Sequence, residues 1–431
     1  MKILKVIHGY PPAYNAGSEV YSQILCRELA SRHQVEVFTR SENILASDYE
    51  NLQSNDVLDK RIGIHSINLP RERNLLKYSH RELNKQFAKV FENLKPDIVH
   101  IGHLNHLSID IVDYIWQQGT PIVYTLHDYW LMCPRGQFLQ RNSSPPFSLC
   151  DKQNDNKCAT KCFSGFVASD VEPNDEVTYW TKFINQRMEM FREVCKKVDC
   201  FVAPSQYLRQ RFVSDFNIPS NKIMYLDYGF NRQNLKNRYR IPNEPFTFGY
   251  IGTHIPAKGI QDLIQAFSQL QTNKKCNLKL WGRFRSDLTP ILQEQIQRLP
   301  EDMSKRIHWM GEYINSNIVD EVFNHIDAIV VPSIWPENSP LVIHEAQELR
   351  IPVITADMGG MAEYVHHNVN GLLFRHRNID DLSKQMSYFA NHPTLAKQLG
   401  ERGYLFSENG NIPDIHLHAT TLENLYKELI K

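Results

Sequence analysis

The 431-residue chain lacks the features that mark nucleic-acid-binding, secreted and membrane-spanning proteins. Lys and Arg together number 48, as do Asp and Glu, so the formal net charge is zero. No basic stripe with interleaved aromatic residues is present. No run approaches the roughly 18 consecutive apolar residues of a membrane-spanning helix, and the opening MKILKVIHGYPP reads as a short strand rather than a signal peptide. We therefore expect a cytoplasmic protein with no nucleic-acid partner.

Two common nucleotide-binding signatures are also missing. After the first expected strand the chain reads HGYPPAYNAGSEV, in which two prolines separate distant glycines, so the tight GxGxxG turn of dinucleotide-binding proteins does not fit. No GxxxxGK[ST] loop occurs anywhere. These absences disfavour a dinucleotide-dependent oxidoreductase and a P-loop nucleotidase.

What the chain does have is an alternation of short apolar runs with amphipathic helical patterns from end to end. This alternation is typical of parallel α/β sheets. The expected strands of the first half are residues 3–8, 34–39, 65–69, 97–101, 121–126, 200–204 and 222–225. Those of the second half are residues 246–251, 278–281, 307–309, 328–331, 352–355 and 371–374.

A polar, proline-containing segment at residues 231–245 separates these two series and is predicted to be a linker. The prediction is thus an N-terminal domain over residues 1–230, with a Cys-rich insert at about 131–165, and a C-terminal domain over 246–408. Residues 409–431 carry a helical pattern with no following strand, and this helix either packs locally or crosses back to the first domain.

The segment PENSPLVIHEA, residues 336–346, is the strongest candidate for a binding site. Ser339 is a suitable N-cap and Pro340 a suitable first helical residue. Free N–H groups at that helix start would suit a diphosphate, while Glu337 and Glu345 could accept hydrogen bonds from sugar hydroxyls. Because a strand precedes and another follows, the site would lie at the carboxyl ends of parallel strands. The plainer interpretation is a loop acid and an ordinary helical glutamate.

Four of the eight cysteines fall within thirty residues, in a polar and turn-rich segment. This distribution is compatible with a structural tetrahedral zinc site. Free thiols are the main alternative, and disulfides are disfavoured in the cytosol. The four cysteines are Cys133, Cys150, Cys158 and Cys162.

Seven motifs together resemble the retaining glycosyltransferases of family four, in the order of that family and over nearly the whole chain. They are GSE from Gly17, TLHDYWLMCPRG from Thr125, VDCFVAPSQYLRQRF from Val198, YIGTHIPAKGI from Tyr250, VPSIWPENSPLVIHEA from Val331, PVITADMGGMAEYV from Pro352 and NGLLF from Asn370. The cysteine-bearing insert after HDYW resembles a subset of the family.

The resemblance implies the GT-B architecture, in which two Rossmann-like doubly wound domains face a central cleft. It implies a nucleotide-sugar donor, with UDP- or GDP-sugars favoured, and a saccharide or lipid-linked acceptor. It also implies retention of anomeric configuration, with the leaving phosphate accepting the proton of the acceptor. The DxD signature of another transferase fold is missing, so we expect no catalytic divalent ion and no cofactor.

The resemblance also assigns roles to individual residues. Glu345 would bind the donor ribose, Glu337 would lie beside the transferred sugar, and Lys258 would neutralise the diphosphate. His127 would orient the reacting sugar, and Asp128 would lie on the acceptor side unless it only caps a helix. The remaining donor-side candidates are Gly17, His254, Arg283, Asn338, Ser339, Pro340, Leu341, Gly359 and Gly360.

Several alternatives stay open on the sequence alone. Many relatives carry a basic residue near His254, so that contact comes from His254, from Arg283 or from neither. Residues 71–89 are basic, with apolar positions that suit either an anionic membrane surface or an ordinary exposed helix. A nucleotide-sugar epimerase, a phosphorylase and a non-catalytic binding subunit remain competing functions.

Overall fold

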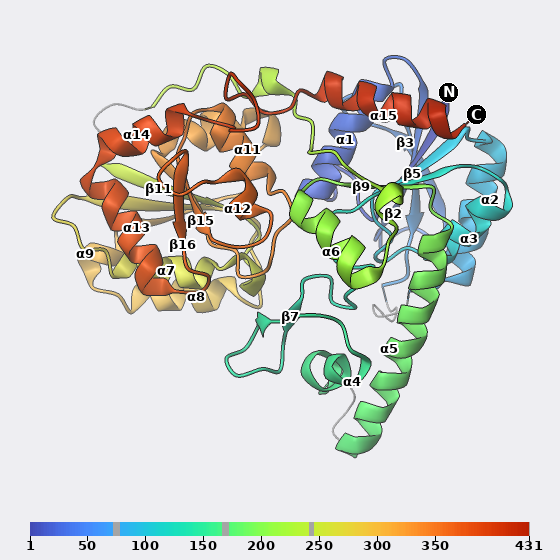
Figure 1. The fold of residues 1–431 in the computed structure, drawn as a ribbon, viewed down its shortest axis with the longest axis horizontal. Coiled ribbons are helices and arrows are strands. Elements are labelled where there is room, and N and C mark those ends of the chain that lie inside the picture. Colours follow the sequence, from blue (N-terminus) through green and yellow to red (C-terminus); the bar gives the residue numbers. More distant parts are fainter. Residues whose placement is uncertain (72–77, 166–171, 241–244, 431) are drawn as a thin grey trace. The chain divides into compact units, whose positions relative to one another are not determined.

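Two sheets of mainly parallel strands organise the computed structural model, which describes residues 1–71, 78–165, 172–240 and 245–430 (Figure 1). Each sheet belongs to its own unit. Unit 1 comprises Met1–Gly136, Asp151–Phe230 and Pro413–Lys431, and unit 2 comprises Gln137–Cys150 and Asn231–Ile412. The cleft expected between the two domains stays a prediction.

The sheet of unit 1 has eight strands in the order β10-β9-β6-β5-β1-β2-β4-β3. All neighbouring pairs are parallel except β3 with β4. Its central strands are continuous apolar runs because helices cover both faces of a parallel sheet. The strands are β1 (Lys2–Val6), β2 (Gln34–Ser41), β3 (Asn51–Asn55), β4 (Gly63–Asn68), β5 (Ile98–Ile101), β6 (Ile122–Thr125), β9 (Cys200–Ala203) and β10 (Ile223–Tyr225).

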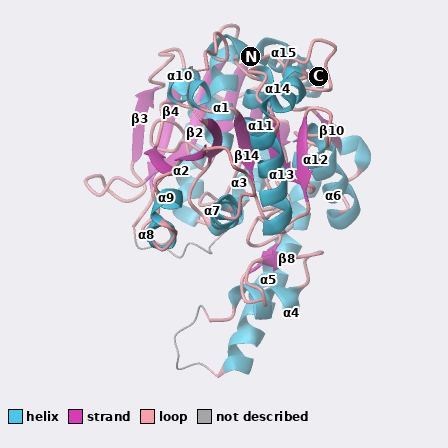
Figure 2. Ribbon diagram, turned by 90° about the vertical axis from the view of Figure 1, so that its left-hand side faces the viewer, coloured by secondary structure: helices cyan, strands magenta, loops and turns pink. Residues whose placement is uncertain are grey.

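Helices α1 and α15 pack together in unit 1, while α2 contacts α3 and α3 contacts α5. Strand order reverses between β1 and β5, and right-handed crossovers then place the helices of the two directions on opposite faces of the sheet. Helix α5 extends well beyond the sheet, with α4 beside it (Figures 1 and 2). The helices are α1 (Gly17–Leu29), α2 (Arg81–Leu94), α3 (Asp110–Gln117), α4 (Asp155–Cys158), α5 (Pro173–Lys196), α6 (Gln206–Phe216) and α15 (Ile415–Leu429).

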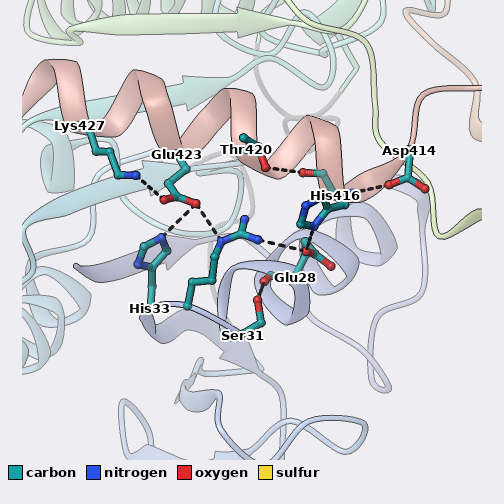
Figure 3. A network of polar contacts seen from close by, with 9 residues as sticks. Glu28, Ser31, His33, Asp414, His416, Thr420, Glu423 and Lys427 are labelled. Carbon is teal, nitrogen blue, oxygen red and sulfur yellow. Dashed lines mark hydrogen bonds and ion pairs between the residues drawn. The ribbon is translucent and has the colours of Figure 1, made fainter.

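The C-terminal helix α15 is fastened to α1 and the turn after it by ion pairs, which Figure 3 shows. Glu423 accepts a hydrogen bond from Arg32 at 2.9 Å and lies 3.5 Å from His33 Nε2. His416 Nδ1 lies 2.8 Å from a carboxylate oxygen of Glu28. These contacts fasten α15, which spans Ile415–Leu429, to unit 1.

The sheet of unit 2 has six parallel strands in the order β13-β12-β11-β14-β15-β16. A separate small hairpin of β7 (Leu139–Gln140) and β8 (Ser148–Leu149) belongs to the same unit. The six strands are β11 (Phe246–Ile251), β12 (Cys276–Trp281), β13 (Ile307–Gly311), β14 (Ala328–Val331), β15 (Val353–Ala356) and β16 (Gly371–Phe374). The helices are α7 (Ile260–Ser268), α8 (Thr289–Gln297), α9 (Glu301–Ser304), α10 (Ile318–Glu321), α11 (Leu341–Glu348), α12 (Met361–Tyr364), α13 (Ile379–Asn391) and α14 (Pro393–Glu401).

Two details differ from the sequence predictions. Helix α11 begins at Leu341, and Pro340 occupies the N-cap position in an extended conformation without a side-chain capping hydrogen bond. Ser339 is therefore not the N-cap. In α2 the apolar side chains of Leu83, Phe87 and Val90 are buried in unit 1, so they cannot rest on a membrane surface.

The other apolar positions of that segment, residues 75 and 76, lie outside the described residues. Among the residues that are described, no helix combines the length and the apolar character needed to cross a bilayer.

Candidate functional site

The candidate site of unit 2 lies where the order of strands reverses, between β11 and β14. Open α/β sheets bind ligands in the crevice at the carboxyl ends of the strands at such a switch point. The loop after β11 leads to Lys258, at the end of a 3₁₀ turn (Pro256–Lys258). The loop after β14 leads to Glu337 and then to α11. The topology therefore brings together two residues that the sequence singled out independently.

Lys258 and Glu337 form an ion pair with a distance of 2.6 Å between Nζ and Oε1. Ser333 also donates to that oxygen, at 2.6 Å. Glu337 is 5% exposed, whereas the Lys258 side chain is 31% exposed. A polar group buried to this degree needs partners for its oxygens, and Glu337 has both a cation and a hydrogen-bond donor. The cation is at the same time accessible from solvent.

Glycines fix the backbone that carries Glu337. The N–H of Gly360 donates to the Glu337 carbonyl at 2.7 Å. A Cβ added at Gly360 would lie 1.4 Å from the Asn338 carbonyl oxygen, so only glycine fits. Gly359 has φ of +61° and also lies against the backbone of Glu337. These two glycines hold the loop of Glu337 in place, and their predicted approach to a donor stays a prediction.

Glu345, on α11, is 9% exposed. Burial raises the pKa of its carboxyl to about 7, and the neighbouring His344 opposes the shift only in part. Tyr313 lies close enough for the Glu345 carboxylate to raise the pKa of its phenol, although burial is the larger cause. A buried carboxyl that is on the edge of ionisation at neutral pH can accept hydrogen bonds from the hydroxyls of a ligand.

The residues between the two glutamates lie mostly inside unit 2. Asn338 is 6% exposed and Ser339 is 2% exposed. The Asn338 side chain accepts a hydrogen bond from the Ser339 N–H. Pro340 is buried, and Leu341, the first residue of α11, is half-buried. Their predicted contacts with a donor stay predictions.

His254 and Arg283, the two candidates for an additional cation, lie in different environments. His254 is 3% exposed, its Nδ1 lies 3.0 Å from the Thr289 hydroxyl, and its ring packs against Trp309. Burial lowers the pKa of His254, so it is neutral and does not supply a positive charge. Arg283 is half-exposed and pairs with Glu312 at 3.3 Å, so of these two it is the one able to reach a ligand.

Unit 1 has its own switch point, between β1 and β5, and it carries two carboxylate–histidine pairs. His8 Nε2 lies 3.2 Å from Glu19 Oε1, and His103 Nε2 lies 3.2 Å from Asp128 Oδ2. The two imidazole rings are 4.5 Å apart. His103 Nδ1 accepts the N–H of Asn105 at 2.9 Å, so its hydrogen is on Nε2 and is donated to Asp128. Sequence reasoning had found only Asp128 among these four side chains.

In this quartet of side chains (His8, Glu19, His103 and Asp128), the electrostatics favour ionised acids and a neutral His8. Burial alone would raise the pKa of Glu19, but hydrogen bonds from His8 and Ser18 lower it to about 2. Burial likewise opposes the ionisation of Asp128, and His103 reverses that effect so that the pKa is lowered. Burial first, and His103 second, lower the pKa of His8. The result is a polar surface with fixed acceptors for hydroxyl groups.

His127 lies beside this quartet, two residues after the end of β6. Its Nδ1 is 2.6 Å from the Tyr228 hydroxyl, and the two rings are stacked. Burial lowers the pKa of His127 well below its usual range, with further contributions from Lys5, His103 and His8. His127 is therefore held as a neutral imidazole. Gly17, another residue that the sequence singled out, is the exposed first residue of α1.

The cysteines of the insert are free thiols. Cys133, Cys158 and Cys162 are buried in unit 1, whereas Cys150 belongs to unit 2. Over the described residues, which include all four, no group of three or more His, Cys, Asp or Glu side chains is arranged to hold a metal ion. The structure thus corresponds to the alternative of free thiols, and a zinc site stays a prediction.

Models of two protein families match the chain. One, described as Glycosyltransferase Family 4, matches residues 16–234, and the other, Glycosyl transferases group 1, matches residues 231–406. Together they span both units.

Curated relatives are similar at low identity over part of their length. An uncharacterised glycosyltransferase of Methanocaldococcus jannaschii (MJ1607) is 22% identical over 42% of this chain and 48% of its own. The capsular polysaccharide biosynthesis glycosyltransferase CapM of Staphylococcus aureus is 23% identical over 59% of this chain and 66% of its own. A GDP-mannose-dependent phosphatidylinositol monomannoside mannosyltransferase of Mycobacterium tuberculosis is 25% identical over 50% and 58%.

Solved structures share the fold along the whole chain. Sucrose-phosphate synthase from Thermosynechococcus elongatus aligns with a TM-score of 0.71 at 17% identity, covering 99% of this chain and 98% of that one. HepE from Anabaena, in complex with UDP and glucose, aligns with a TM-score of 0.69 at 17% identity, covering 99% and 100%. The two doubly wound units are thus the GT-B architecture, as the motif resemblance implied.

Proposed function

Because the chain belongs to glycosyltransferase family 4, we propose that it transfers a hexosyl group from a nucleotide sugar to an acceptor hydroxyl with retention of configuration. The observation that carries this proposal is the Lys258–Glu337 pair at the switch point of unit 2. It joins an accessible cation to a buried carboxylate at the place where α/β sheets bind ligands.

The charges of this pair suit the two ends of the bond that breaks. Negative charge develops on the leaving diphosphate, and the Lys258 ammonium would stabilise it there. Positive charge develops on the sugar ring, and the Glu337 carboxylate would stabilise that charge from the other side. Since both groups are already positioned before a ligand binds, little reorganisation is needed in the transition state.

Glu345 would bind the donor through ribose hydroxyls. Its buried carboxyl, with a pKa of about 7, gains a hydrogen-bond donor when a hydroxyl approaches, and that favours the ionised form. UDP and GDP sugars are the favoured donors, since HepE was solved with UDP and the mycobacterial relative is named GDP-mannose-dependent. Arg283 would add a second positive charge near the diphosphate.

The acceptor would bind to unit 1. Carboxylates and imidazoles at the β1/β5 switch point offer the hydrogen-bond acceptors and donors that saccharide hydroxyls need. His127 would contact the transferred sugar as a neutral imidazole. We expect a saccharide or lipid-linked acceptor, a cytoplasmic location with or without contact to the membrane surface, and no divalent ion in catalysis.

A binding experiment with the full chain tests the donor site. Thermal unfolding is measured with UDP, GDP and ADP and with their common sugars, for the wild type and for Lys258→Met, with the exposed Lys397→Met as matched control. One nucleotide family should raise the melting temperature of the wild type and the control but not of Lys258→Met. Equal stabilisation of all three proteins would refute the role of Lys258, and no stabilisation by any nucleotide would refute the donor site.

Retention is tested on the product. Incubation of the full chain with the stabilising donor and a panel of saccharide acceptors should give a glycoside with the same anomeric configuration as the donor, as read by proton NMR coupling constants. A product of opposite configuration would refute the retaining mechanism without touching the donor site.

A further inference from the structure

A lysine is buried in the core of unit 1. Lys5 is the fourth of the five residues of β1 and is 1% exposed. Its Nζ is shielded from solvent, and among the described residues it has no hydrogen-bond partner. Nζ lies 5.9 Å from the centre of the Tyr21 ring. An ammonium buried without a hydrogen-bond partner is costly, and its charge acts strongly on the groups around it.

Three imidazoles are affected by that charge. The charge of Lys5 contributes to lowering the pKa of His100, of His127 and of His418, after the larger effect of burial in each case. A Cβ added at Gly102 would lie 3.4 Å from Lys5 Nζ and 3.5 Å from His127 Nε2, so both nitrogens face the same point. Burial lowers the pKa of Lys5 itself only to about 8, so it is still mainly cationic at neutral pH.

Each of these histidines also contacts a tyrosine hydroxyl. His127 Nδ1 is 2.6 Å from the Tyr228 hydroxyl and His418 Nε2 is 2.8 Å from that of Tyr21. His100 Nδ1 is 2.5 Å from Tyr426 and its Nε2 is 2.7 Å from Thr125 Oγ1. His418 and Tyr426 both lie on α15, so the C-terminal helix completes the cluster.

We propose that Lys5 is a positioning residue whose charge helps to keep His127 a neutral imidazole beside the transferred sugar. The inference rests on the proposed function for the role of His127, but not for its protonation state. A neutral ring matters there because an imidazolium would repel the positive charge that develops on the sugar in the transition state.

The other groups that face His127 do not replace Lys5 in this role. They are Tyr21 on α1, His100 on β5, His8 and His103 in the loops after β1 and β5, and Tyr228 after β10. His103 and His8 also contribute to the lowered pKa of His127, but each contributes less than Lys5 does.

Lys5→Met is the test variant because methionine has a similar length and no charge, and Lys5→Arg keeps the charge. Lys2→Met, an exposed lysine on the same strand, is the matched control.

His127 is followed by NMR of the full chain with labelled histidine, and its signal is identified from its loss in His127→Asn. Removing the charge should move the protonation midpoint of His127 upward by at least about one pH unit. Lys5→Arg and Lys2→Met should leave it in place.

A folded Lys5→Met protein with an unshifted His127 midpoint overturns the inference. If Lys5→Met does not fold, Lys5→Leu and Lys5→Gln make the same measurement. Removal of an unpaired buried charge should raise the melting temperature rather than lower it. Once a donor and acceptor are known, Lys5→Met should lower kcat most at acidic pH and leave the KM for the donor unchanged. The NMR result stands even if no transfer activity is found, so failure of the proposed function and failure of this inference are separable.

Discussion

The carboxyl of Glu345 makes the stability of unit 2 depend on pH in a direction opposite to that of most acids. Burial raises its pKa from an ordinary value of 4.5 to about 7. Between these values the folded state holds more protons than the unfolded state, so the free energy of unfolding falls as pH rises through this window. Above pH 7 the penalty is complete and the curve levels off.

The magnitude follows from the two pKa values. A folded carboxyl that titrates at about 7 and an unfolded one at 4.5 lower the free energy of unfolding by about 2.5 kcal/mol between pH 5 and pH 8. Glu345→Gln is neutral at every pH and removes this slope. Relative to the wild type, the variant should therefore gain about 2.5 kcal/mol between pH 5 and pH 8.

Urea unfolding of the full chain at pH 5, 6, 7 and 8 measures this difference, with Glu401→Gln, an exposed carboxyl of the same unit, as control. The control should track the wild type at all four pH values. A constant stability difference between Glu345→Gln and the wild type would show that Glu345 is ionised throughout, and the argument from burial would then be wrong.

Three further predictions follow from other parts of the structure. Lys258→Met should weaken binding of the nucleotide sugar at least about tenfold by titration calorimetry, because a charge-assisted contact is lost, and unchanged affinity would contradict the proposed diphosphate contact. Hydrogen bonds from Lys427, and less so the charges of His33 and Arg32, lower the pKa of Glu423 to about 2. Its contribution is present above pH 4.5 and lost as pH falls toward 2, so Glu423→Gln should lower the melting temperature at pH 7 by more than at pH 4. Elemental analysis should find about one zinc per purified chain if the thiols of the insert form the predicted site, and a value well below one would eliminate it.

The strands could be predicted from the sequence because a parallel strand with helices on both faces is a continuous apolar run. All thirteen expected strands occur in the structure with boundaries that differ by a few residues at most. The missed strands have no such run. Strand β3, with the sequence NLQSN, lies at the edge of its sheet with three of five residues exposed, and β7 and β8 have two residues each.

The candidate site of unit 2 could be predicted because most of its residues belong to one long motif. Its other residue, Lys258, lies in the same unit. The quartet of unit 1 could not, because its members come from helix α1 and from the loops after β1, β5 and β6, which are adjacent only through strand order. His8 and His103 each follow an expected strand, and this signal was present in the sequence. The two histidines can be placed together only when β1 and β5 are known to be neighbours in the sheet. Hydrophobic periodicity predicts the strands but not their order.

The two switch points treat charge differently, and this separates the pH dependence of binding from that of transfer. In unit 2 the donor must ionise Glu345 to use its carboxylate, so donor affinity should rise with pH up to about 7 and then level off. In unit 1 the ammonium of Lys5 and burial keep His127 neutral, so kcat of the wild type should not follow His127 in that range. Measured at saturating donor, kcat should therefore be flatter with pH than the donor affinity. A kcat that rises in parallel with donor affinity would mean that His127 titrates after all, or that Glu345 acts in the transfer step.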